Sequence, residues 1–157
     1  MHTFQQKYQE GCAFERLIDA HFSKSFIIHC VNRDMERLGI DRIFINRKNG
    51  HRFSVEYKSD SKADQTGNVF IETVSVDTTQ KLGWALTSIA QLLFYYIPPR
   101  HQLLVIHMLS LREHIQKWST LYKIKKAKNR GYFTHGICVP IEELKSLSVA
   151  TRNISST

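Results

Sequence analysis

Apolar residues recur with a helical spacing along the first part of the chain. Over residues 4–22 they stand three and four positions apart, which places them on one face of a helix. A second, long helix is expected over residues 80–96, because an apolar stretch there ends at Pro98 and Pro99, which stop helices. A third helix is expected over residues 110–121.

Strand-like runs separate these helices. Two of them flank Asn49-Gly50, a dipeptide that favours tight hairpin turns because both central positions of such a turn need a positive φ. A short strand and a short helix are expected over residues 137–147. The other expected strands are 25–31, which should be buried, the hairpin strands 41–46 and 52–58, then 69–76 and the interior strand 102–109.

The order of helix, strands, helix and strand predicts an α/β fold with a central mixed β-sheet flanked by helices. Neither a repeat nor a linker divides the chain, so one domain is expected over residues 1–148. Within it, the basic segment 117–132 leaves the third helix as a loop or arm. Residues 149–157 are rich in serine and threonine and are expected to be a flexible tail.

Composition narrows the class of protein. Of the 157 residues, 42% are hydrophobic and 23% are charged, as in a globular protein and unlike a disordered or fibrous one. Lysine and arginine exceed the acids by 22 to 14, and the net charge of +8 favours a polyanionic partner. The three cysteines are far apart and odd in number, so we expect reduced thiols and neither a disulfide nor a zinc framework.

The chain carries no sequence signal for export or membrane insertion. Its first residues lack the charged start and the apolar stretch of a secretion signal. The longest apolar region is interrupted by Thr87, Ser88 and Gln91. We therefore expect a cytoplasmic protein with no membrane partner.

The second strand of the expected hairpin carries an acid and a base on one face. Because side chains alternate along a strand, Phe53, Val55 and Tyr57 share the apolar face, and Glu56 and Lys58 share the other. This places two opposite charges side by side where the strand runs into a polar loop.

The hairpin turn predicts which residue faces this pair. If Asn49 and Gly50 form a two-residue loop, Asp41 lies directly opposite Lys58 and diagonally opposite Glu56. Direct partners start about 5 Å apart and diagonal ones about 7 to 8 Å apart, so all three side chains reach one small volume. A three-residue loop would shift the register by one residue and separate them.

A third acid, Glu15, falls inside the apolar stripe of the first helix. A carboxylate there needs a partner. The partner is either an arginine or a backbone amide at the edge of the core, or the charged cluster around Asp41 and Glu56.

Two carboxylates about 7 Å apart repel each other by roughly 2 kcal/mol at an effective dielectric constant near 20. A divalent cation offsets this repulsion better than Lys58 alone. Mg²⁺ is usually held by one or two carboxylates and several waters, which leaves room for phosphate oxygens. Such a site would polarise a phosphate, with Lys58 orienting a water or stabilising the developing negative charge.

Asp41, followed after fourteen residues by Glu56-Tyr57-Lys58, on a hairpin between two helices, resembles the PD-(D/E)XK nuclease superfamily. The resemblance covers about residues 8–108 and implies a restriction-endonuclease-like α-β-β-β-α-β core that binds Mg²⁺ or Mn²⁺. It also implies that Asp41 and Glu56 are metal ligands, that Tyr57 lends its main-chain carbonyl and that Lys58 is the catalytic lysine. Glu15 matches the first-helix glutamate of many members.

Three further residues fit the resemblance less specifically. Gln91 and Tyr95 would lie one turn apart on the helix expected over residues 80–96, which is similar to a Gln-x-x-x-Tyr element near the active site in exonuclease-like branches. Hydrogen-bonded residues of a buried helix would give the same pattern. Glu72 is either a supporting acid of the site or an exposed strand residue.

Basic residues form two groups along the chain. Lysine-rich segments neutralise phosphates without reading sequence, and interleaved aromatic side chains can stack on exposed bases. A solvated loop is the alternative. The predicted nucleic-acid-binding residues are Arg42, Arg47, Lys48 and Arg52 around the hairpin, and Lys123, Lys125, Lys126, Lys128 and Arg130 in the arm.

These features favour a Mg²⁺-dependent deoxyribonuclease, structure-selective or non-specific, of a DNA repair, recombination or restriction type. The alternative is a catalytically silent nucleic-acid-binding protein of the same fold that acts as a subunit of a larger assembly. The pattern does not distinguish DNA from RNA or endonuclease from exonuclease, and it is compatible with a homodimer.

Overall fold

The computed structural model describes residues 4–155. The helices are α1 (Phe4–Phe22), α2 (Arg33–Arg37), α3 (Ala63–Thr66), α4 (Trp84–Thr87), α5 (Met108–Leu121) and α6 (Ile141–Leu147), and η1 (Asp77–Thr79) and η2 (Pro98–Arg100) are 3-10 turns. The strands are β1 (Phe26–Cys30), β2 (Arg42–Asn46), β3 (Arg52–Ser59), β4 (Asn68–Val76), β5 (Lys81–Leu82), β6 (Leu92–Ile97), β7 (Gln102–His107), β8 (Ile124–Lys128), β9 (Phe133–Pro140) and β10 (Ala150–Asn153).

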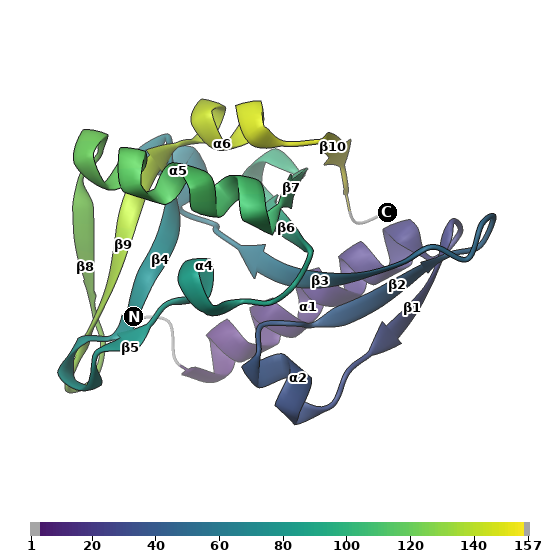
Figure 1. Cartoon of the computed structure of the whole chain (residues 1–157), viewed down its shortest axis with the longest axis horizontal. Coiled ribbons are helices and arrows are strands. Elements are labelled where there is room, and N and C mark those ends of the chain that lie inside the picture. Colours follow the sequence, from purple (N-terminus) through teal and green to yellow (C-terminus); the bar gives the residue numbers. More distant parts are fainter. Residues whose placement is uncertain (1–3, 156–157) are drawn as a thin grey trace.

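The strands form two sheets (Figure 1). The larger sheet is mixed and has the order β1-β2-β3-β6-β7-β10, in which β3 and β6 are parallel and the other neighbours are antiparallel. The smaller sheet is antiparallel, in the order β5-β4-β9-β8. The predicted α/β class with a mixed sheet flanked by helices is therefore confirmed, and the second sheet was not predicted.

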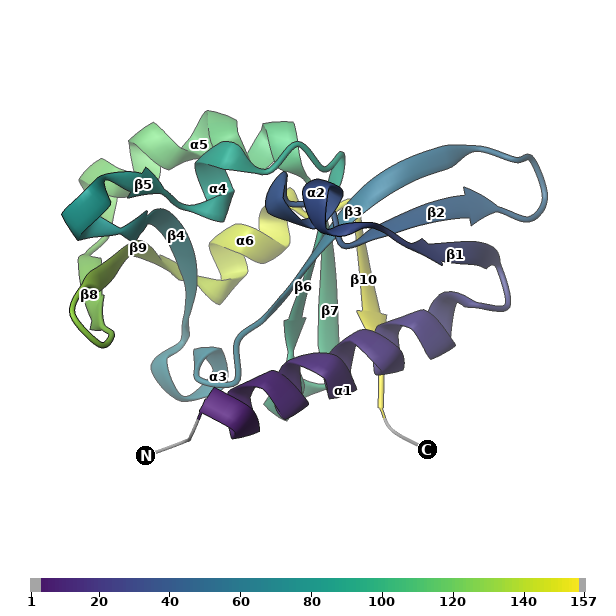
Figure 2. The same cartoon turned by 90° about the horizontal axis from the view of Figure 1, so that it is seen from below.

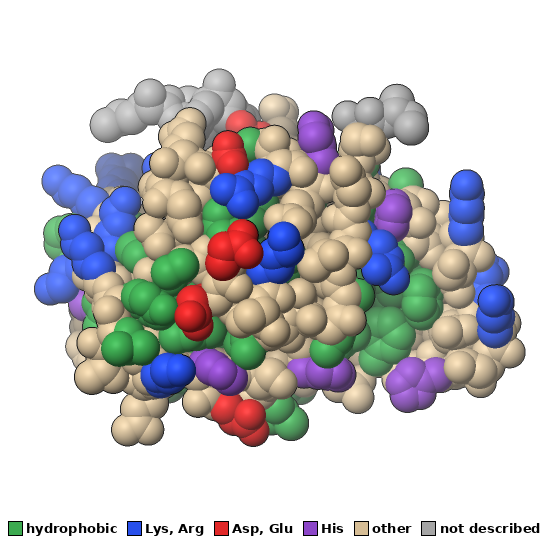
Figure 3. Space-filling view, turned by 90° about the horizontal axis from the view of Figure 1, so that it is seen from above, with side chains coloured by type: hydrophobic (Ala, Val, Ile, Leu, Met, Phe, Trp, Pro, Cys, Tyr) green, Lys and Arg blue, Asp and Glu red, His purple; other side chains and the backbone are tan. Residues whose placement is uncertain are grey.

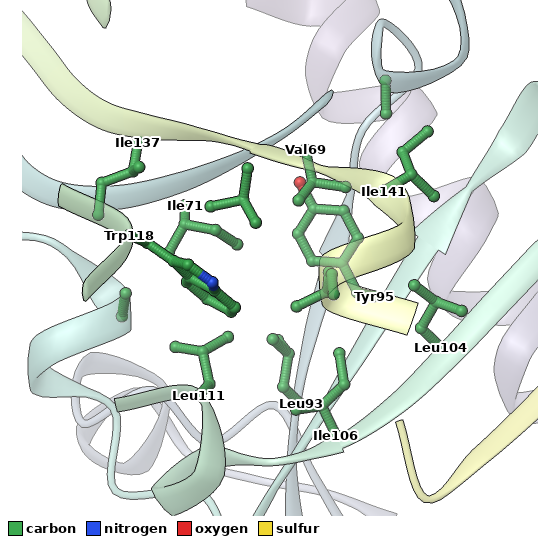
Figure 4. Close-up of a cluster of buried hydrophobic side chains, with 14 of the residues drawn as sticks. Val69, Ile71, Leu93, Tyr95, Leu104, Ile106, Leu111, Trp118, Ile137 and Ile141 are labelled. Atoms are coloured by element: carbon green, nitrogen blue, oxygen red, sulfur yellow. The ribbon is translucent and has the colours of Figure 1, made fainter. Parts of the chain in front are cut away.

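Each face of the larger sheet has its own core. Helix α1 crosses one face, and α4, α5, α6 and the smaller sheet lie over the other (Figure 2). The core under α1 is aromatic, with Phe44, Tyr57 and Phe94 packed together. The core between the two sheets is mostly aliphatic and surrounds the fully buried Trp118 of α5 (Figure 4).

The predicted hairpin is confirmed, but its register is not. The loop has four residues, 47–50, because the Asn46 side chain accepts the Lys48 N–H and the Gly50 N–H closes the turn onto the Asn46 carbonyl. Ile43 therefore pairs with Ser54, two positions from the predicted partner Glu56. A shift by two residues keeps every side chain on its predicted face, since the side-chain period of a strand is two.

The helix predicted over residues 80–96 is wrong. Residues 81–97 form β5, the single turn α4 and the strand β6 instead. Strand β6 lies between β3 and β7 and its last five residues are buried, so both of its faces are apolar. A strand buried on both sides has no alternation, and periodicity alone cannot separate it from a buried helix.

Three other sequence-based expectations need correction. The segment after α5, predicted to be a loop or arm, is the hairpin β8–β9. The expected tail contains β10, which pairs with β7, and Ile154 beyond it is buried, while residues 156–157 lie outside the described range. Strand β1 is an edge strand that is partly exposed instead of buried. The pairings of β9 with β4 and of β10 with β7 are long-range, and local sequence does not encode them.

The short helices α2 and α3 were not predicted, but several longer elements agree with the sequence. Helices α1 and α5 and strand β4 occur where the pattern predicts them, and β7 is interior, with β6 and β10 as neighbours. None of the helices within residues 4–155 combines the length and apolar character needed to cross a bilayer.

Candidate active site

Strand β3 presents its two faces to different cores. Tyr57 packs under α1, while Glu56 and Lys58 point to the opposite side, toward α4. In the parallel ladder with β6, Glu56 pairs with Leu93 and Lys58 with Tyr95. The predicted alternation along this strand is therefore confirmed.

Glu56 is the most constrained charged residue of the site. Its side chain is only 3% exposed, and its Oε1 lies 2.6 Å from the Lys58 Nζ. Its Oε2 is buried and has no hydrogen-bond partner within residues 4–155. Burial raises the pKa of Glu56. Lys58 and the nearby Ser88 hydroxyl lower this pKa, and the charge of Asp41 raises it further.

Asp41 sits just before β2, where the hairpin ladder becomes irregular. Its N–H donates to the Val55 carbonyl at 2.9 Å, although Val55 is already paired with Arg42. The next amide of β3, that of Tyr57, donates to Asp41 Oδ2 at 2.7 Å. The Asp41 carboxylate thus accepts a β3 amide that a main-chain carbonyl of β2 would accept in a regular hairpin. This bond holds it near Glu56.

The loop before β2 and the loop after α4 are bonded to each other near Glu56. The Ser88 hydroxyl donates to the Gly39 carbonyl at 2.8 Å. Gly39 has φ +83°, and a Cβ there would lie 2.6 Å from the Ser88 Oγ. Arg112 of α5 donates to the main-chain carbonyls of Ser88 and Ala85. The burial of Glu56 is therefore built into the fold by α5 and by a glycine.

Glu72 supports the site from β4. Its Oε1 accepts the Trp84 N–H at 3.4 Å, and burial raises its pKa, with Lys58 lowering it and Glu56 raising it further. The Trp84 ring centroid lies 5.7 Å from the Lys58 Nζ, a cation–π contact. Glu72 is therefore a partly buried, hydrogen-bonded residue and not an exposed strand residue.

Gly83, which precedes Trp84, makes this arrangement testable. A Cβ at Gly83 would lie 2.5 Å from the Glu72 carbonyl oxygen, which belongs to a rigid strand. We expect Gly83→Ala to lower the free energy of unfolding by about 1–3 kcal/mol in urea denaturation, as overpacking does.

Gly11→Ala is the matched control for this substitution. Gly11 lies within α1, and no described atom outside the helix backbone comes within 4 Å of the position that an alanine Cβ would take there. Alanine at this position should raise stability by up to about 1 kcal/mol through helix propensity. Equal effects of the two substitutions would contradict the packing proposed around Gly83.

The structure places Glu15 and Arg42 away from the roles predicted for them. The Arg42 guanidinium is bonded to Glu15 Oε2 at 3.0 Å and to Asp19 Oδ2 at 3.1 Å, and its side chain is 11% exposed. It also stacks over the Tyr57 ring. Glu15 thus has the arginine partner that was one of its two readings, on the α1 side of the sheet, and Arg42 is not free to bind nucleic acid.

Gln91 and Tyr95 do not share a helix face. Gln91 precedes β6, and its Oε1 accepts the Ser54 N–H at 3.0 Å, which fixes the loop after α4 onto β3. Tyr95 is in β6, and its hydroxyl donates to Asp60 Oδ2 at 3.1 Å. Both residues position main chain around Glu56 and Lys58 without touching their charged groups.

The predicted basic residues lie at two ends of the molecule. Lysine and arginine side chains gather over β8 at one end and over the β2–β3 turn at the other (Figure 3). Arg47, Lys48 and Arg52 are exposed at this turn, and Arg52, the nearest to Glu56 along the strand, lies about 13 Å from it. In β8, Lys125 lines a cavity, and Lys126 and Lys128 point the other way. Arg130 is exposed in the β8–β9 turn.

A divalent cation fits this donor set by chemistry. The unpartnered Glu56 Oε2 and the Asp41 carboxylate are hard oxygen donors, and Mg²⁺ needs only one or two carboxylates when waters complete its shell. In the described part of the chain, no three His, Cys, Asp or Glu side chains gather into a group that could hold a metal ion. The carboxylate of Glu15, which would be the third ligand, is bonded to Arg42.

Three residues that contact the candidate active site or the loops around it were not predicted from the sequence. Trp84, Ser88 and Arg112 carry no local signal because each reaches the site from a different element across the fold. Only Gly83-Trp84, a glycine before an aromatic residue, stands out, and it lies in the stretch that was predicted to be a helix.

Comparison of the chain with protein-family models, curated proteins and solved structures finds no match in any of the three.

Proposed function

We propose that the protein is a Mg²⁺-dependent nuclease that hydrolyses phosphodiester bonds in DNA. One observation carries this proposal. The buried Glu56 offers one oxygen to Lys58 and keeps the other without a partner, beside the Asp41 carboxylate. Holding the buried Glu56 ionised beside Asp41 is costly unless a cation is bound there, because burial and the charge of Asp41 both disfavour the charged form of Glu56.

The residues have separate roles in this proposal. Asp41 and Glu56 hold the cation, and the main-chain carbonyl of Tyr57 is a further candidate ligand. When bound, the cation supplies Lewis-acid polarisation of the phosphate and a lowered pKa for an attached water. Lys58 places its positive charge next to the acids, where it stabilises negative charge that develops on the phosphate oxygens.

Neighbouring groups hold Lys58 in place. The Trp84 ring lies beside its ammonium group, and Glu72 fixes the Trp84 main chain. Because Lys58 is 32% exposed while Glu56 is buried, the pair opens to solvent on the lysine side. A phosphate would therefore approach from the side of Lys58.

We also propose that the larger sheet contains a restriction-endonuclease-like core. The elements α1, β1, β2, β3, α4 and β6 support this, since they follow the α-β-β-β-α-β order that the resemblance implies, with α2 between β1 and β2 and with α3, β4 and β5 between β3 and α4. In it, β6 takes the place expected for residues 102–109. The smaller sheet is inserted between β3 and β6, apart from β8 and β9, which follow later in the chain.

The proposal is tested by incubating purified protein with single-stranded, duplex and branched DNA, with Mg²⁺ or Mn²⁺ and with EDTA. Cleavage of at least one substrate that requires the cation is expected. Binding without cleavage under every condition would instead support a catalytically silent nucleic-acid-binding protein. Equal cleavage in EDTA would contradict the assigned roles of Asp41 and Glu56.

The outward lysines of β8 give a prediction for DNA binding. Replacing Lys126 and Lys128 by Ala should weaken binding and lower the slope of log K against log salt by up to about 2, because each lysine that neutralises a phosphate releases counterions. Fluorescence anisotropy at several salt concentrations measures both effects. Lys145→Ala, an exposed lysine of α6, should leave the slope unchanged. An unaltered slope in the double variant would exclude this face of β8.

A further inference from the structure

A cavity of about 730 Å³ opens beside Lys58, between β4, the end of α5 and β8. Its volume lies in the range of about 300–1,000 Å³ that is usual for small-molecule sites. Lys58 and Trp84 belong both to its wall and to the candidate active site. Whatever fills the cavity therefore lies next to the proposed point of cleavage.

The cavity wall combines aromatic rings with cations. Phe70, Trp84 and Tyr122 contribute rings, and such side chains stack on nucleic-acid bases of any type. Lys62, Lys123 and Lys125 add ammonium groups to that of Lys58, each able to meet a phosphate. Rings inside and cations around them match a base attached to its phosphates.

Asp60 is the one acid among the described residues that line this cavity, and its carboxylate is fully engaged. Its Oδ1 accepts the N–H groups of Lys62 and Ala63, and its Oδ2 accepts the Phe70 N–H and the Tyr95 hydroxyl. Lys58 is paired with Glu56, whereas Lys62, Lys123 and Lys125 form no ion pair among the described residues, so these three can meet an anionic ligand.

The shape of the site separates unpaired from paired nucleotides. A base within a duplex is stacked on both sides and reaches a side cavity only after it is flipped out, which costs a few kcal/mol. An unpaired base avoids most of this cost. A cavity that stacks one base therefore discriminates between DNA structures without reading their sequence.

We propose that this cavity binds the base of an unpaired nucleotide adjacent to the cleaved phosphate, so that the substrate is single-stranded DNA or DNA with a single-stranded end. This substrate assignment rests on the proposed nuclease function. Lys58 then lies between the bound base and the cation-binding acids, and Lys123 and Lys125 meet the phosphates on the other side of that base.

Cys138 lines the cavity and provides a direct readout, while Cys30 on the edge strand β1 serves as an internal control. The Asp41→Asn protein is alkylated with a thiol reagent in the presence of a single-stranded oligonucleotide, a blunt duplex of the same sequence, or thymidine monophosphate. Peptide mass spectrometry gives the rate at each cysteine. We expect the single strand to slow alkylation of Cys138 at least fivefold, with Cys30 unchanged and the duplex inactive.

Substitutions provide an independent test of the same cavity. Tyr122→Leu keeps apolar volume but removes the ring, and Lys125→Ala removes an exposed charge at little structural risk. Each should raise the Kd for the single strand by roughly tenfold, as expected for one lost stacking contact of about 1–3 kcal/mol or one lost phosphate contact, and leave duplex binding unchanged. Tyr132→Leu, in the β8–β9 turn, is the matched aromatic control and should change neither.

The outcomes separate this inference from the nuclease proposal. Cation-dependent cleavage without protection of Cys138, or equal protection by single strand and duplex, overturns the cavity assignment and leaves the nuclease intact. Protection by thymidine monophosphate at the same concentration as by the oligonucleotide identifies a free nucleotide as the ligand and overturns the substrate assignment. Protection by the single strand with no cleavage of any DNA overturns the nuclease and leaves a nucleotide-binding cavity.

Discussion

Asp41→Asn is expected to lower the rate of Mg²⁺-dependent plasmid nicking by at least about 1,000-fold. Loss of one charged ligand removes several kcal/mol of transition-state stabilisation, and about 1.4 kcal/mol corresponds to a factor of ten in rate. The fold should be kept, because the asparagine side-chain oxygen can still accept the Tyr57 N–H that Asp41 accepts at 2.7 Å. Stability without metal should be unchanged or slightly higher, since repulsion with Glu56 is relieved.

The matched control for Asp41 is Asp34→Asn in α2. Its side chain is exposed and contacts only Arg37 on the same helix, through a long ion pair of 3.7 Å, among the described residues. This substitution should leave nicking within twofold of the wild-type rate. Full activity of Asp41→Asn, or a collapsed fold revealed by thermal unfolding and circular dichroism, would contradict the role assigned to Asp41.

Glu56→Gln is expected to lower the rate of nicking by at least about 100-fold and also to change how stability depends on pH. Burial raises the pKa of Glu56 above its ordinary value of 4.5, so the folded state holds this proton more tightly than the unfolded state. The stability that Glu56 contributes is therefore full below pH 4.5 and is lost as the pH rises through the folded pKa. Glutamine does not titrate and avoids this loss.

The difference between variant and wild type reports the loss of the Glu56 charge. Burial also raises the pKa of Glu15, but Glu15 does not sense Glu56 and its contribution subtracts out. Glu56 helps to raise the pKa of Glu72, so its removal lowers that pKa and changes stability in the same direction. Urea unfolding across pH 4 to 8 should show the variant gaining stability relative to wild type as the pH rises. A constant difference over this range would mean that Glu56 is not held in the buried environment described above.

Magnesium should reverse this pattern in the wild-type protein. A cation bound by ionised Asp41 and Glu56 stabilises the folded state by mass action and favours the charged carboxylates. Added Mg²⁺ should therefore raise the melting temperature of wild type at neutral pH and leave that of Glu56→Gln nearly unchanged. Equal shifts in both proteins would place the bound ion elsewhere.

The site could be predicted from the sequence to the extent that it depends on strand alternation. Glu56 and Lys58 share a face, and Tyr57 packs behind them, because a strand has a period of two. The turn was assigned two residues and has four, and because this error is even the paired residues of β2 and β3 keep their predicted faces. Asp41 lies just before β2 and is held near Glu56 by accepting the Tyr57 N–H.

The fold was less predictable where a segment is surrounded by others. The buried run Leu92–Ile97 has no alternation, so its strand state depends on β3 and β7 on either side. The lysines of β8 suggested a solvated arm, although a basic edge strand is also a common way to prevent strand-to-strand aggregation. β3 is distant from β6 in the sequence, whereas β8 pairs with the adjacent β9, which is itself placed by the distant strand β4.

The supporting residues were unpredictable for the same reason. Arg112 of α5 donates to the Ser88 carbonyl after α4. Position 39 needs a glycine because Ser88 packs against it. For Glu15 the sequence showed the position on the apolar stripe of α1 but not the partner. The structure shows that this partner is Arg42.

Binding of Mn²⁺, followed by electron paramagnetic resonance of the free ion, tests most directly whether Asp41 and Glu56 hold a cation, and it requires no knowledge of the substrate. The wild-type protein should bind one ion tightly at neutral pH, and Asp41→Asn and Glu56→Gln should each lose that ion while Asp34→Asn keeps it. Tight binding that persists in both active-site variants, or none in the wild-type protein, would contradict the cation site on which the proposed function depends.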